Sequence, residues 1–175
     1  MSPRRHIARA SSVFLAAITL AVATVAPSQA AEPGPETDSQ AGRQVVRLAN
    51  GDLRITLPER ADLTASASSS LAGAPYTTPS TDERNFVQAG YTCETGRTCL
   101  EVPYGGGWYV FKEDSYGTYA MYDWYGEGTW VDNQTGNWST SIQDGSTQVQ
   151  CLQSGYDDSV NWTPIDSFWI RSWGC

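Results

Sequence analysis

The side chains best suited to chemistry in this sequence are neighbouring carboxylates in polar segments. Glu113-Asp114 and Asp157-Asp158 are adjacent acids, and Asp123 and Glu127 flank a Trp-Tyr-Gly turn. A glycosidase needs two carboxylates placed across the scissile bond, and spacing in the sequence does not establish such a pair. Acids in turns more often stay solvated or act as weak calcium ligands. We therefore expect a protein that binds without catalysis and is not an enzyme.

Histidine chemistry depends on a single residue, His6. It lies within residues 1–30, which combine a basic start, an apolar run over 13–25 and the small-residue site Ser28-Gln29-Ala30. This pattern is typical of a secretory signal peptide, and its apolar run is shorter than the roughly 20 residues that span a bilayer. We predict a secreted, extracellular chain that begins at Ala31. Without histidine, Ser-His-Asp catalysis, Cys-His catalysis and His-ligated zinc are excluded.

The net charge of the chain argues against two further classes of partner. The whole chain has 11 Lys and Arg against 19 Asp and Glu, a net charge of −8. Loss of the first thirty residues removes three arginines and no acid, which leaves 8 basic and 19 acidic residues and a net charge of −11. Nucleic-acid binding depends on cations that displace counterions, and attack on anionic membranes favours a cationic face. We expect no nucleic-acid partner and no insertion into membranes.

The four cysteines, Cys93, Cys99, Cys151 and Cys175, lie in the C-terminal half of the chain. An even number in a small secreted domain predicts disulfides, and four cysteines allow three connectivities. Cys93 and Cys99 enclose only five residues with Gly96 at the bend, which favours pairing with each other and leaves Cys151 for Cys175. We expect structural bonds rather than reactive thiols or metal ligands.

The segment before residue 91 is predicted to have three parts. Residues 31–41 are acidic and rich in proline, which predicts a disordered start. Two alternating runs around Asn50-Gly51 predict a β-hairpin with a type I′ turn, so residues 31–60 form a disordered start plus a hairpin segment. The hairpin either packs on the later domain, which we favour, or belongs to a removable pro-segment. Residues 61–90 have the Ser/Ala/Thr/Pro-rich composition of a linker, with one short helical turn at 81–90.

Residues 91–175 have a different composition, with seven Trp, eight Tyr and two Phe in 85 positions. No segment shows helical periodicity over three turns, whereas short β-rich runs cut by Gly, Asp and Asn recur every eight to twelve residues. This spacing is typical of a small all-β sandwich or barrel. We predict one aromatic-rich, disulfide-bonded β domain over 91–175.

So many aromatic side chains exceed what a core of this size should need. Because side chains alternate along a strand, Trp108 and Val110 should face away from Tyr109 and Phe111. An exposed aromatic patch rimmed by polar groups usually marks a binding face. We assign a binding role to five aromatic residues, and we place three further tryptophans, Trp138, Trp162 and Trp169, in the core. The five binding candidates are Trp108, Tyr109, Trp124, Tyr125 and Trp130.

Two segments resemble copies of each other, residues 131–140 and 160–169, each running from a valine through polar residues into a strand. Together with Cys93-x5-Cys99-Leu100 and Tyr104-Gly105-Gly106, they make residues 91–175 similar to the βγ-crystallin-like secreted bacterial proteins of peptidase inhibitor family I36. The resemblance implies a βγ-crystallin-like Greek-key sandwich and inhibition of an extracellular peptidase. The Cys93–Cys99 loop with Arg97 is the candidate contact.

The same resemblance bears on calcium. Residues 132–137 begin like a βγ-crystallin calcium loop, so Asp132 and Asn133 are candidate calcium ligands. Gly136 and Asn137 stand where the family has Ser/Thr and Ser. We therefore expect no obligatory cofactor, with calcium as the alternative.

Three functions remain open at this point. The first is a monomeric inhibitor of an extracellular peptidase. The second is a carbohydrate- or cell-wall-binding module that uses exposed Trp and Tyr, and the third is an antimicrobial or killer-toxin-like protein. Substitution of Trp124 and Trp130 should abolish glycan binding and spare inhibition by the Cys93–Cys99 loop.

Overall fold

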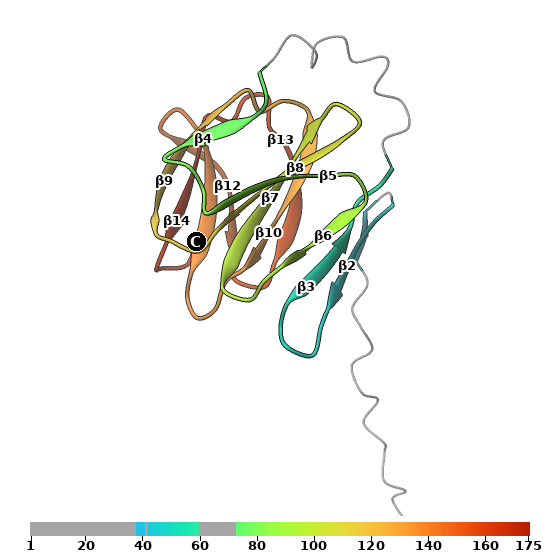
Figure 1. The fold of residues 1–175 in the computed structure, drawn as a ribbon. Helices are drawn as coiled ribbons and strands as arrows, with labels where there is room; N and C mark the ends of the chain where they lie inside the picture. Colours follow the sequence, from blue (N-terminus) through green and yellow to red (C-terminus); the bar gives the residue numbers. More distant parts are fainter. Residues whose placement is uncertain (1–37, 41, 60–72) are drawn as a thin grey trace, which may run out of the picture. The chain divides into compact units, whose positions relative to one another are not determined.

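The structure is a computed structural model that describes residues 38–40, 42–59 and 73–175 (Figure 1). The predicted signal peptide lies outside these residues. The described part of the chain is all-β and contains no helix, which confirms the predicted fold class. Correspondingly, none of the described residues belongs to a helix that could span a membrane.

Fourteen strands in the described residues form three antiparallel sheets. Sheet I has the order β13 (Asp157–Asn161), β10 (Glu127–Asn133), β7 (Arg97–Tyr104), β8 (Gly107–Glu113), β5 (Glu83–Val87). Sheet II has the order β12 (Thr147–Gln153), β11 (Ser139–Asp144), β14 (Ser167–Arg171), β9 (Gly117–Tyr122), β4 (Tyr76–Thr78). Sheet III has the order β1 (Asp38–Gln40), β2 (Arg43–Arg47), β3 (Leu53–Thr56), β6 (Gly90–Cys93).

The connections of sheets I and II repeat one pattern. In the four strands β7 to β10, β10 lies beside β7 and β7 beside β8, while the third strand, β9, joins sheet II. In β11 to β14, β14 lies beside β11 and β11 beside β12, while the third strand, β13, joins sheet I. The repeat therefore differs from the one expected from the sequence, because residues 131–140 run from β10 into β11 and residues 160–169 run from β13 into β14.

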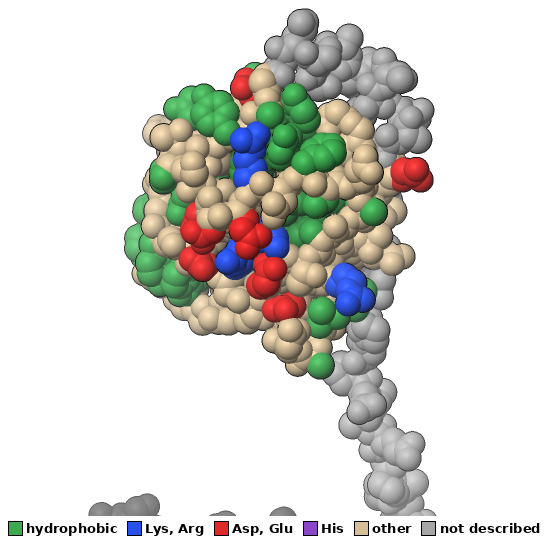
Figure 2. All heavy atoms as spheres, viewed as in Figure 1, with side chains coloured by type: hydrophobic (Ala, Val, Ile, Leu, Met, Phe, Trp, Pro, Cys, Tyr) green, Lys and Arg blue, Asp and Glu red, His purple; other side chains and the backbone are tan. Residues whose placement is uncertain are grey.

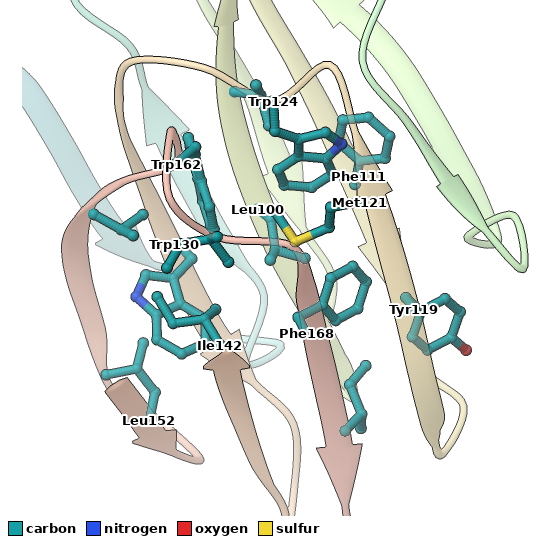
Figure 3. Packing of buried hydrophobic residues seen from close by; sticks show 14 residues of the cluster. Leu100, Phe111, Tyr119, Met121, Trp124, Trp130, Ile142, Leu152, Trp162 and Phe168 are labelled. Carbon is teal, nitrogen blue, oxygen red and sulfur yellow. The ribbon is translucent and has the colours of Figure 1, made fainter. Parts of the chain in front are cut away.

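Sheets I and II form a β-sandwich around the main hydrophobic core. Aromatic rings fill much of it, since Phe111 contacts Trp124 at 4.3 Å between ring centroids and Trp124 contacts Trp162 at 5.1 Å. Figure 3 shows side chains from the two sheets converging in this layer. Its buried members are Leu100, Val102, Phe111, Tyr119, Met121, Trp124, Trp130, Ile142, Leu152, Val160, Trp162, Ile165, Phe168 and Ile170.

The predicted hairpin exists and packs on the other face of sheet I. Leu53, Ile55 and Leu57 form a second buried cluster with Trp108 and Val131. The turn differs from the type I′ prediction, because Gly51 has a φ of +90° while Asn50 is not among the residues with positive φ. The Gly51 N–H donates to the Leu48 carbonyl at 2.9 Å, as in a three-residue loop that ends in one left-handed glycine.

Part of the predicted linker is also structured. Residues 76–78 are β4, which pairs with β9, and residues 83–87 are β5, which pairs with β8 instead of forming a helical turn. Residues 38–40, expected to be disordered, pair with β2 as β1. These short polar strands lie at sheet edges, where one row of backbone hydrogen bonds to an inner strand suffices and apolar alternation is not needed.

Both expected disulfides are present. Cys93 bonds Cys99 across the bend between β6 and β7, and Cys151 of β12 bonds the C-terminal residue Cys175. The first pair is fully buried in the cluster under the hairpin, whereas the second lies at the edge of sheet II. The described residues contain no free cysteine.

Candidate functional site

Three of the five aromatic binding candidates are core residues. Trp108, Trp124 and Trp130 are 6%, 3% and 0% exposed, so their assignment to a binding face is wrong. Sheet I is covered on both sides, which buries Trp108 under the hairpin and Trp130 inside the sandwich. Trp124 follows β9 and closes the end of the sandwich, where its Nε1 donates to the Tyr76 carbonyl at 3.1 Å. Substituting these residues would test folding rather than binding.

The other two candidates lie at the surface. Tyr125 is 48% exposed, and Tyr109 is half-buried against the main core. Of the three tryptophans expected in the core, Trp162 is fully buried, while Trp138 and Trp169 are only half-buried. The prediction that some aromatic surface is exposed is therefore confirmed, but mostly for other residues.

Arg97 does not project from the Cys93–Cys99 loop as a free side chain. It is the first residue of β7, and its guanidinium forms an ion pair with Glu83 of the edge strand β5. Lys112 lies next to this pair, with its Nζ 3.0 Å from Glu94 Oε1 and 3.4 Å from Glu83 Oε2. The loop itself is tied down, because the Gly96 N–H donates to the Asn133 carbonyl at 2.8 Å.

The calcium candidates Asp132 and Asn133 point to different partners. The Asp132 carboxylate is buried and accepts hydrogen bonds from the Gln134 N–H and the Thr140 hydroxyl. Burial raises its pKa to about 6. The Asn133 amide donates to the Cys93 carbonyl at 3.0 Å, and its oxygen accepts from Arg47 at 3.3 Å. The two side chains therefore do not converge on a common oxygen site.

The adjacent acids are likewise separated or engaged. Asp157 pairs with Arg43, whereas Asp158 accepts from Gln150. Glu113, Asp114 and Asp82 bring carboxylate oxygens within 4.8 Å of one another. Glu113 is buried, however, and accepts from the backbone N–H groups of residues 82, 114 and 115. Burial and the nearby Glu113 raise the pKa of Asp82.

A buried ionic network joins sheet III to sheet I, and the sequence alone did not reveal it. Arg43 of β2 donates to both oxygens of Glu101 of β7, at 3.1 and 3.2 Å, and Tyr91 of β6 donates to Glu101 at 2.6 Å. Thr129 of β10 also donates to Glu101. A cavity of about 180 Å³ opens beside this network, next to Leu57 and Pro58. The chain's own donors already occupy both oxygens of Glu101, so the network is suited to holding the hairpin in place.

The most developed surface feature is a group of four side chains on β5, β7 and β8, which we call the β5–β8 aromatic surface: Arg84, Phe86, Tyr104 and Tyr109. In the strand register Phe86 lies opposite Tyr109 and Arg84 opposite Phe111, and Tyr104 lies opposite Gly107, two residues before Tyr109. All four side chains therefore share one face of sheet I. Phe86 and Tyr104 contact Tyr109 edge-on, with centroids 5.4 and 5.3 Å apart. Phe86 is 46% exposed.

Two features hold this surface rigid. The Phe86 ring lies against Gly107, where a Cβ would approach the ring to 2.8 Å, so only glycine permits this contact. The ring centroids of Tyr109 and Phe111 are 6.4 Å apart, and Phe111 in turn contacts Trp124 of the main core. Figure 2 shows hydrophobic side chains beside a basic group in the upper part of one face, above a mixed group of acidic and basic side chains. The segment 83–87, Glu-Arg-Asn-Phe-Val, does not alternate between apolar and polar residues, so no local signal in the sequence reveals this strand.

A second aromatic group lies at the C-terminal end. Arg171 lies over the rings of Trp169 and Trp173, with its Cζ 5.2 and 5.9 Å from the two ring centroids. Trp173 is 51% exposed. Arg171 also donates to the Ser139 hydroxyl, the Gln148 amide oxygen and Cys151 Sγ. Its guanidinium is thus committed to neighbouring side chains. The i, i+2, i+4 spacing of Trp, Arg and Trp is the sequence signal for this group.

Comparison of the chain with family models, with curated proteins and with solved structures finds no match in any of the three.

Proposed function

We propose that this protein is a secreted, non-catalytic carbohydrate-binding protein that stacks sugar rings on the β5–β8 aromatic surface. The observation that carries the proposal is the exposed Phe86 ring, fixed between Gly107 and Tyr109 at the edge of sheet I. The apolar face of a sugar ring packs on such a preorganised ring at little entropic cost, because the protein side chains are already ordered. Tyr104 and Tyr109 extend the platform and add hydroxyl groups at its rim.

The location of the surface supports binding rather than stability. Phe86 belongs to an edge strand and leaves nearly half of its side chain in water, where burial contributes little to the fold. The core behind it is filled by other rings, and Tyr109 reaches that core through Phe111. Exposed apolar patches with polar rims are typical of interaction sites.

The test is a glycan array followed by calorimetric titration of the best ligand with the oxidised protein. Phe86→Ala and Tyr109→Ala should each weaken binding about tenfold, a loss of about 1.4 kcal/mol, which lies within the roughly 1–3 kcal/mol that a nucleobase gains by stacking on one aromatic ring. Tyr156→Ala is the matched control, because Tyr156 is 63% exposed and outside this surface. Retained glycan affinity in both Phe86→Ala and Tyr109→Ala would refute the proposed site.

Inhibition of an extracellular peptidase is the second candidate, and it depends on the resemblance of the sequence to family I36. In each four-strand group the fourth strand lies beside the first, as in a Greek key, while the third strand joins the other sheet. Arg97, however, is held by Glu83 at a strand end and is poorly placed to enter a protease cleft. Titration against a thermolysin-like and a subtilisin-like protease tests this candidate, with reduced and alkylated protein as control. Arg97→Gln should leave any inhibition unchanged.

A further inference from the structure

Arg84 is unusual among the cations of this acidic chain. Arg43, Arg97 and Lys112 are paired with carboxylates, and Arg47 and Arg171 donate to neutral oxygens or sulfur. Among the lysines and arginines of the described ranges, only Arg54 and Arg84 make no hydrogen bond or ion pair. Of these two, Arg84 alone is placed over an aromatic ring, with its Cζ 4.6 Å from the centroid of Tyr109.

The cation–π contact orders the guanidinium without using its donors. A guanidinium near a ring centroid is attracted by the ring quadrupole, and the five N–H groups of the Arg84 guanidinium make no hydrogen bond within the described residues. Arg84 and Phe86 are two residues apart on β5 and so lie on the same side of the strand. A ring seated on Phe86 therefore has a fixed, uncommitted cation next to it.

We infer that the ligand of this surface is an acidic glycan whose uronic-acid carboxylate pairs with Arg84 while the neighbouring sugar ring stacks on Phe86; this inference depends on the proposed carbohydrate-binding function. A planar carboxylate matches the two-pronged donor geometry of arginine. The net charge of −11 that remains after loss of the first thirty residues opposes dense polyanions at long range, so the carboxylates should be separated by neutral sugars. A heavily sulfated chain does not meet that requirement.

The experiment uses an octasaccharide of alternating glucuronic acid and N-acetylglucosamine and the same octasaccharide after reduction of its carboxyl groups to alcohols. The wild-type protein should bind the carboxylated form about tenfold or more tightly than the reduced form. Arg84→Gln should lose this preference and bind both forms with the same, weaker affinity. Arg84→Lys should keep only part of the preference, because a point charge replaces the planar fork. Arg54→Gln, which removes the other uncommitted arginine, should behave as wild type.

Each contrary result has a distinct meaning. Equal binding of both octasaccharides by the wild type, with Phe86→Ala abolishing both, would overturn the role of Arg84 and leave the carbohydrate-binding function standing. Binding of neutral glycans alone would do the same. A sulfated octasaccharide that binds more tightly than the carboxylated one, and equally tightly after its carboxyl groups are reduced, would also overturn the inference. An acidic peptide that binds more tightly than the carboxylated octasaccharide would have the same meaning. If no glycan of any class binds, the proposed function fails and this inference fails with it.

Discussion

Arg43 and Glu101, which are 58 residues apart in the sequence, share two hydrogen bonds of 3.1 and 3.2 Å with both side chains excluded from solvent. Burial opposes the charge on Arg43, but Glu101, together with Tyr91 and Asp157, more than compensates and raises the arginine pKa. The same environment raises the pKa of Tyr91, through burial first and Glu101 second. The pair connects β2 of sheet III to β7 of sheet I, so the N-terminal hairpin is an integral part of the fold.

Arg43→Met should destabilise the protein by about 3–5 kcal/mol, because it leaves the buried carboxyl of Glu101 without its arginine partner. The double variant Arg43→Met with Glu101→Leu should regain much of this loss, since an apolar pair removes the unpaired charge. Urea denaturation monitored by tryptophan fluorescence measures both. Arg54→Met on the exposed face of β3 is the control and should change stability by less than about 0.5 kcal/mol. A loss of less than about 0.5 kcal/mol for Arg43→Met would contradict the role of the Arg43–Glu101 pair in holding the hairpin in place.

Asp132 should make the protein less stable as the pH rises. Its pKa is raised by burial from 3.8 to about 6, so its contribution to stability is complete below pH 3.8 and is lost as the pH rises through about 6. Two pKa units correspond to about 3 kcal/mol. Asp132→Asn should remove this part of the slope between pH 4 and 6.5, measured as the difference from wild type in urea denaturation. Asp144→Asn is the control, because Asp144 is an exposed acid at the far end of β11 from Thr140, and it should leave the slope intact.

Gly128→Ala should be among the most damaging small substitutions. A Cβ at this position would lie 2.1 Å from Trp162 Nε1 and 2.2 Å from the Glu101 carbonyl, which also share a hydrogen bond of 2.8 Å. Overpacking and loss of that bond should together cost about 3 kcal/mol or more. Gly106→Ala is the matched control, because a Cβ on Gly106 would have no neighbouring atom within 4 Å. Similar melting temperatures for the two variants would be inconsistent with the tight contact.

Removal of the Cys151–Cys175 bond by a double Cys→Ser change should cost about 3.5 kcal/mol, the loss that chain entropy predicts for a loop of this length. Thermal unfolding of the double variant, compared with the wild type under oxidising conditions, measures this loss. The single variant Cys151→Ser should lose as much, since Cys175 has no other cysteine partner in the described residues. Unchanged unfolding in both would mean that the C-terminal segment is held by Arg171 and the tryptophans instead.

Local patterns in the sequence were enough to predict much of the fold. Alternating runs and glycine spacing predicted an all-β domain, and the position of the cysteines predicted both disulfides. Leu53, Ile55 and Leu57 alternate as a strand must when one face is buried, and the hairpin that this alternation predicts is present. These features depend on neighbours in the chain, so the sequence contains them directly.

Only the tertiary structure determines which aromatic side chains are exposed and which are buried. Trp108 and Phe111 lie on opposite faces of β8, and a strand pattern predicts that one such face meets solvent. Here the sandwich covers one face and the N-terminal hairpin covers the other, so both residues are buried. Phe86 and Arg84 lie in a segment with linker composition, and pairing with β8 places them beside Tyr109. Which partners meet depends on contacts between distant segments, and such contacts leave no local pattern in the sequence.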